Sequence, residues 1–115
     1  MDLTATILAA TGASVAPEAR LEGINLLPVL ERRAAEIDRT LFWRISSARP
    51  QQAVRSGDWK LLMDGTRALL FDLRTDIGER SNLIGQRSDV ARHLQQMLTA
   101  WQKDVDAEAK LAPVR

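Results

Sequence analysis

The dipeptide Asp64-Gly65, placed between two apolar runs, constrains the fold of this chain more than any other feature. An Asp-Gly pair in such a setting is a strong short-range signal for a β-hairpin, because both residues tolerate the backbone that a tight turn needs. Residues 58–63 precede the pair and residues 67–73 follow it, and both runs are rich in apolar side chains. We therefore expect two antiparallel strands joined at this turn.

Two further strands are expected upstream of this hairpin. Residues 40–46 alternate with the period of two that is typical of a strand. Residues 52–56 form a weaker run, which Gly57 and Asp58 connect to the hairpin through a tight turn. Because sequential strands with short connections usually pair with their neighbours, the sequence predicts a four-stranded antiparallel meander.

The segment from Ser88 to Lys110 shows the clearest helical periodicity in the chain. Ser88 suits a helix N-cap, and Asp89 in the first turn is favourable to the helix dipole. Apolar residues recur at three- and four-residue spacing, which produces a single apolar stripe. The stripe consists of Val90, Leu94, Met97, Leu98, Trp101 and Val105. We expect this helix to cover one face of the sheet.

The N-terminal part of the chain has a different character. Residues 2–11 have near-helical apolar spacing, with Asp2 as the expected N-cap and Gly12 as the expected C-cap. A loop over 13–24 leads to a short helical turn over 25–30. The predicted fold class is therefore α+β: a four-stranded antiparallel sheet with a C-terminal amphipathic helix packed on it, preceded by a short N-terminal helical segment.

Composition argues against several classes of partner. The 115 residues carry a formal net charge of +1, which gives no electrostatic case for nucleic acid binding. No apolar run reaches the roughly 18 residues that a membrane-spanning helix needs, so we expect no membrane partner. There is no cysteine, and hence no thiol chemistry. The N-terminus lacks the basic region of a secretory signal, and both a cytoplasmic and a periplasmic location stay open.

Candidate catalytic residues are scarce. Nucleophilic catalysis by serine needs an adjacent base, and His93, the one histidine, lies off the apolar stripe as a solvated helix residue would. The acids Asp72, Asp76 and Glu79 surround one loop and have the oxygen ligands that a hard cation prefers. They lack EF-hand spacing, and loop capping with surface ion pairs is the favoured explanation. The residues alone thus predict no catalytic and no metal-binding group.

The tryptophans and their cationic neighbours leave two hypotheses open. Trp43, Trp59 and Trp101 each lie among apolar residues, so we expect all three to pack in the core. The alternative is that one of them is exposed and stacks on a sugar. Arg44 and Lys60 follow the first two tryptophans and point to the opposite face of their strands, where they either contact an anion or solvate the sheet.

Five segments follow one another in an order that is specific, although each motif alone is weak. They are DLTATILAATGA (2–13), LEGINLLPVL (21–30), RTLFWR (39–44), AVRSGDWKLL (53–62) and LLFDLRTDIGERSNL (69–83). In this order and spacing, the chain resembles the C-terminal region of type I sulfatases, the arylsulfatase A-like family. It departs from the family pattern at Ala5 and Ile77, where proline is usual, and at Phe71, where tyrosine is usual.

The resemblance implies a part of an enzyme and not a whole one. Residues 39–115 would form the small C-terminal domain of a sulfuric ester hydrolase, and residues 1–38 would be an N-terminal helical segment left over from the large domain. The family uses formylglycine, made from Cys or Ser in Cys/Ser-x-Pro-x-Arg, and a divalent cation, usually calcium. This sequence contains neither form of that motif. We therefore expect no cofactor in this chain, no activity on its own, and the missing catalytic domain as partner.

The resemblance also suggests where a substrate would be contacted. The small domain borders the substrate pocket in such enzymes, and the break between the first two predicted strands is the best candidate here. Arg44, Arg49 and Lys60 are the predicted substrate-binding residues, since a guanidinium or ammonium group suits a sulfate ester. Two alternatives remain: a stand-alone, non-catalytic interaction module and a carbohydrate-binding module. Without the large domain, the apolar N-terminal segment would favour a homo-oligomer.

Overall fold

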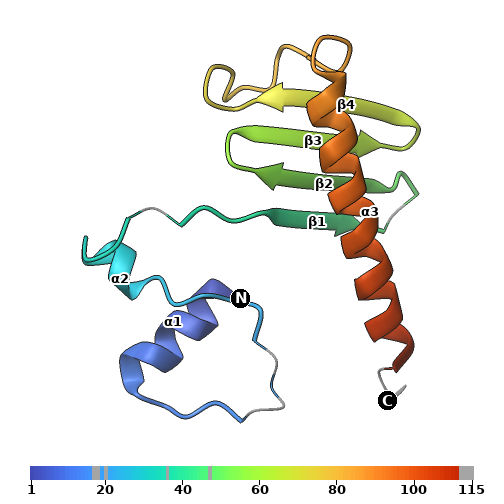
Figure 1. Cartoon of the computed structure of the whole chain (residues 1–115). Helices are drawn as coiled ribbons and strands as arrows, with labels where there is room; N and C mark the ends of the chain where they lie inside the picture. The colour runs from blue at the N-terminus through green and yellow to red at the C-terminus, as the bar shows by residue number, and fades with distance from the viewer. Residues whose placement is uncertain (17–18, 20, 36, 47, 112–115) are drawn as a thin grey trace. The chain divides into compact units, whose positions relative to one another are not determined.

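The structure, a computed structural model, describes residues 1–16, 19, 21–35, 37–46 and 48–111 (Figure 1). The chain forms two compact units, residues 1–37 and residues 38–115. The boundary predicted from the sequence lies one residue later. Within the described ranges, no helix has the length and apolar character needed to cross a bilayer.

The second unit contains the predicted antiparallel meander. Its strands are β1 (Leu41–Ile45), β2 (Gln51–Ser56), β3 (Trp59–Asp64) and β4 (Arg67–Asp72). Each strand pairs with the next, in the order β1-β2-β3-β4. The expected architecture, an α+β fold with a four-stranded antiparallel sheet, is confirmed.

Short loops set the register of the sheet. Gly57, with φ of 55°, lies in the loop between β2 and β3, where Ser56 pairs with Trp59. The next hairpin turns one residue later than expected, because Asp64 still pairs with Arg67 and is the last residue of β3. Its loop starts with Gly65, whose φ of 59° lies in the left-handed region that glycine adopts at low cost.

Helix α3 (Ser88–Leu111) packs on one face of the sheet, as the apolar stripe predicted (Figure 1). Residue pairing places one row of four side chains on that face: Phe42, Val54, Leu61 and Leu70. Helix residues Leu94 and Leu98 are buried against this row. The rings of Phe42 and Trp101 stack with centroids 5.2 Å apart and an interplanar angle of 7°. The core of the second unit therefore lies between α3 and this face.

The first unit contains α1 (Asp2–Thr11) and α2 (Leu27–Leu30). Gly12 ends α1 in the left-handed conformation, with φ of 66°, as predicted. The predicted N-cap was wrong by one residue, because Met1 is the N-cap and Asp2 lies in the first turn. Gly23 lies so close to the start of α1 that a Cβ atom there would be 2.2 Å from the carbonyl oxygen of Met1.

Two side chains of α1 accept hydrogen bonds from the segment before α2. The Asp2 Oδ1 atom accepts a hydrogen bond from the Ile24 N–H at 3.1 Å, and the Thr6 Oγ1 atom accepts one from the Leu26 N–H at 3.0 Å. The Thr6 hydroxyl also donates to the Asp2 carbonyl oxygen at 2.7 Å. These contacts satisfy backbone donors that would otherwise need water.

Replacement of adjacent leucines on β3 should separate the two faces of the sheet. Leu61, 1% exposed beneath α3, should lose about 2–5 kcal/mol of unfolding free energy on Leu61→Ala, because the change leaves a cavity in the core. Leu62→Ala makes the same chemical change on the opposite face and should cost clearly less. Urea unfolding of both variants measures the difference, and equal losses would show that the two faces are equally packed.

Candidate functional site

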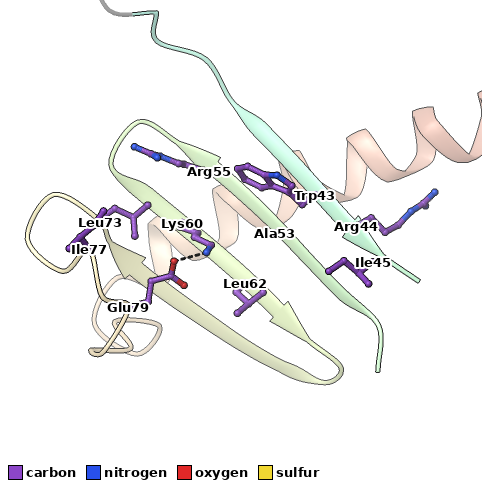
Figure 2. A pocket seen from close by; sticks show the side chains of 10 residues that line it. All are labelled: Trp43, Arg44, Ile45, Ala53, Arg55, Lys60, Leu62, Leu73, Ile77 and Glu79. Carbon is purple, nitrogen blue, oxygen red and sulfur yellow. Dashed lines mark hydrogen bonds and ion pairs between the residues drawn. The ribbon is translucent and has the colours of Figure 1, made fainter. Parts of the chain in front are cut away.

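A wide groove lies on the face of the sheet opposite α3 (Figure 2). The register creates it, because Trp43, Ala53 and Leu62 pair with one another and point away from the Phe42 row. Its volume is about 510 Å³. The side chains that line it are Trp43, Arg44, Ile45, Ala53, Arg55, Lys60, Leu62, Leu73, Ile77 and Glu79.

Much of this groove is apolar and open to water. Trp43 is 46% exposed, Ile45 57% and Ile77 83%, whereas Ala53 on the floor is buried. The expectation that Trp43 packs in the core was therefore wrong, because its strand face is the one that α3 does not cover. Trp59 and Trp101 do pack against the core, as predicted.

An ion pair crosses the groove from β3 to the loop after β4. The Lys60 ammonium donates to Glu79 Oε1 at 2.5 Å, and each side chain is about a quarter to a third exposed (25% and 30%). Glu79 has a φ of 53°, which an L-residue adopts only when its surroundings hold it there. The carboxylate of Asp76 supplies that restraint, because its Oδ2 atom accepts hydrogen bonds of 2.8 Å from the N–H groups of both Arg80 and Ser81.

The loop acids act as caps, the favoured explanation of their pattern. Hydrogen bonds from the Ser81 and Arg80 amides hold the pKa of Asp76 below its usual range. The Asp72 Oδ1 atom accepts a bond from the Arg74 N–H at 3.0 Å. No group of three or more potential metal ligands gathers anywhere in the described part of the chain.

Each of the three predicted substrate-binding cations is paired with a carboxylate. Arg44 donates to Asp106 of α3 at 2.6 Å, and Lys60 is held by Glu79. Arg49 pairs with Asp64, and hydrogen bonds from Gln51 and then Arg49 lower the pKa of that carboxyl.

The groove unites only part of this predicted set. Lys60 lies within it, whereas Arg44 is at its border and points away from Lys60 (Figure 2). Arg49 does not line it. Sulfate binding by the three residues stays a prediction.

Sequence reasoning did not assign Arg55 or Ile77 to a site. Arg55 is two residues from Ala53 on β2 and so shares its face of the sheet. That periodicity is a signal that could have identified Arg55. Ile77 reaches the groove from an irregular loop, where no periodic pattern exists to reveal it.

Comparison with known proteins gives matches among solved structures alone; no family model and no curated protein matches. Ps i-CgsB in complex with k-i-k-neocarrahexaose matches 87% of this chain and 23% of its own, with a TM-score of 0.75 and 22% identity. A 2-O GAG sulfatase matches 99% of this chain and 26% of its own, with a TM-score of 0.72 and 22% identity. A protein in complex with its substrate D-glucosamine-2-N,6-O-disulfate matches 89% of this chain and 23% of its own, with a TM-score of 0.69 and 23% identity.

These matches establish the fold. The chain spans about a quarter of each solved chain, and the match takes in most or nearly all of its own length. The sequence resemblance to sulfatases is thus confirmed at the level of the fold.

Asp76→Ala should lower the free energy of unfolding at pH 7, and the deficit should shrink in acid. The folded-state pKa of Asp76 lies below its ordinary value of 3.8, so the ionised carboxylate stabilises the folded chain above that value. This stabilisation disappears as the pH falls through the lowered folded-state pKa. Urea midpoints at pH 7 and at about pH 3 test this. Asp104→Ala, at an exposed position of α3, is the control; a deficit at Asp76 that grows in acid would contradict the capping role.

Proposed function

We propose that this chain is the small-domain part of a sulfatase, a sulfuric ester hydrolase, and that it packs against a catalytic part. One observation carries the proposal: the fold of a 2-O GAG sulfatase covers 99% of this chain, whereas the chain covers 26% of that sulfatase. A protein that matches so completely over so small a share of its neighbour has the character of a domain and not of a whole enzyme.

The hydrogen bonds of the motif residues support this proposal. Two of the five sulfatase-like segments contact each other through such residues. Asp2 and Thr6 accept hydrogen bonds from the second segment, and Gly23 allows its backbone to lie close to the start of α1. In the last segment, the Asn82 Oδ1 atom accepts bonds from the Leu70 N–H at 3.0 Å and the Ile84 N–H at 3.1 Å. The segments that carry the resemblance thus contain residues with specific structural roles.

Catalysis would come from the catalytic part. A formylglycine nucleophile needs Cys or Ser in Cys/Ser-x-Pro-x-Arg, and this sequence has no such stretch. Covalent catalysis by another group would need a nucleophile beside a base, and the single histidine, His93, is exposed on α3. We propose that the chain alone is inactive and that nucleophile and cation ligands both belong to the partner.

A carbohydrate-binding module is the second candidate. This hypothesis requires a tryptophan ring that is open to a sugar, and Trp43 is exposed. An aromatic ring with an open face offers an apolar platform on which a sugar can stack. Tryptophan fluorescence during titration with neutral and sulfated oligosaccharides tests it. A saturable change in the wild-type chain that is absent in Trp43→Ala would favour this module over the sulfatase domain.

The purified chain should not hydrolyse an aryl sulfate such as 4-nitrophenyl sulfate, with or without calcium. The same assay should show turnover when the chain is mixed with a catalytic polypeptide, defined as a polypeptide of the same genome that carries Cys/Ser-x-Pro-x-Arg and is expressed separately. The catalytic polypeptide alone is the control. Turnover by the isolated chain would refute the proposed division of roles, and so would full activity of the catalytic polypeptide without it.

A further inference from the structure

The turn between β3 and β4 contains the one Asp-Gly pair of the sequence, Asp64-Gly65, and there is no Asn-Gly pair. In such a pair the glycine nitrogen can attack the Cγ atom of the aspartic acid, because glycine has no side chain to hinder the approach. The N–Cγ bond forms, one water molecule leaves, and a five-membered succinimide closes. Water then opens the ring at the α-carbonyl, and the product is isoaspartate of unchanged mass. The reaction needs water and no other reactant.

The carboxylate of Asp64 is held at both of its oxygen atoms. Gln51 Nε2 donates a hydrogen bond to Oδ1 at 3.1 Å, and Arg49 donates to Oδ2. The Asp64 side chain is only 12% exposed, although Gly65 and Thr66, the next two residues, are exposed. Rotation of the carboxyl group toward the following nitrogen would break both contacts, one of which is charge-assisted.

The attacking nitrogen is held as well. The Gly65 N–H donates to the Pro50 carbonyl oxygen at 3.2 Å, which extends the pairing of Gln51 with Asp64 by one residue. Attack requires this nitrogen to lose its proton and turn toward Cγ, and the hydrogen bond opposes both. Three consecutive residues, 49–51, therefore restrain the two reacting groups.

Charge acts in the same direction as this geometry. A carboxyl group loses water readily only in its protonated form, because an ionised carboxylate would have to expel an oxide. Hydrogen bonds from Gln51 and then Arg49 hold the pKa of Asp64 below its usual range. The reactive, protonated form is thus rarer at neutral pH than in an unrestrained Asp-Gly turn.

We propose that Asp64-Gly65 is a latent site of isoaspartate formation, which residues 49–51 keep unreactive in the folded chain. The reaction would insert one extra backbone carbon at the end of β3, where Asp64 pairs with Arg67. It would also replace the carboxylate that binds Gln51 and Arg49, so the loop between β1 and β2 would lose its contacts with the turn. This inference does not depend on the proposed function.

Prolonged incubation of the full chain at pH 7, followed by trypsin digestion, tests it. The tryptic peptide 61–67 contains the pair, and chromatography separates its aspartate and isoaspartate forms. Gln51→Ala and Arg49→Ala should each accumulate isoaspartate several-fold faster than the wild type. Gln52→Ala, the same change on the other face of β2, should match the wild type. Urea unfolding checks each fold, and the Arg49 side chain, 69% exposed, can be removed with little loss of packing.

A synthetic peptide with the sequence of residues 61–67 supplies the unrestrained rate. Isoaspartate should form fastest in this peptide, at intermediate rates in the two variants and slowest in the wild type. A wild-type rate equal to that of the peptide would overturn the protection. Folded variants that react no faster than Gln52→Ala would overturn the role of residues 49–51, and a peptide that forms no isoaspartate would overturn the site itself.

Discussion

The pairing register of the sheet is the constraint on which the second unit depends. It places Phe42, Val54, Leu61 and Leu70 in one row, on which α3 packs. Because side chains alternate between faces, a slip of one residue in one strand would turn its buried residue to the other face. Short glycine-containing loops prevent the slip by leaving no spare residue between the paired ends of β2 and β3, and of β3 and β4. Core and groove are therefore two results of one register.

The regular elements could be predicted from the sequence because each has a local signal. The meander follows from period-two runs and glycine turns, and α3 from a stripe sustained over many turns. The face that α3 covers could not be predicted in the same way. Trp43 and Phe42 are adjacent and both apolar, so local pattern does not say which one becomes buried. The one-residue error at the Asp64 turn arose similarly, since either Asp64 or Gly65 can begin a tight turn and only the Asp64–Arg67 pairing decides.

The candidate site was predictable only where it lies on a strand. Lys60 was identified from its place in β3, but its partner Glu79 was not. The orientation of Glu79 depends on a left-handed backbone that Asp76 holds through the N–H groups of two later residues. A sequence pattern shows that acids surround a loop, but not which one caps the backbone and which one reaches a lysine across the sheet. Ion pairs between distant segments, such as Arg44 with Asp106, are likewise consequences of the tertiary fold.

The two faces of the sheet differ in how far their side chains are buried. The interface between α3 and the sheet contains four fully buried side chains, Val54, Leu61 and Leu70 from the strands and Leu94 from the helix, so the second unit has a core of its own. On the opposite face Ala53 and Phe71 are buried, but Trp43 and Ile45 leave large apolar groups exposed. The stability of this unit therefore rests on one face of the sheet. The polar residues of the groove are partnered within the chain, because Lys60 pairs with Glu79, Arg44 pairs with Asp106, and the Arg55 guanidinium donates to the Gly57 carbonyl oxygen.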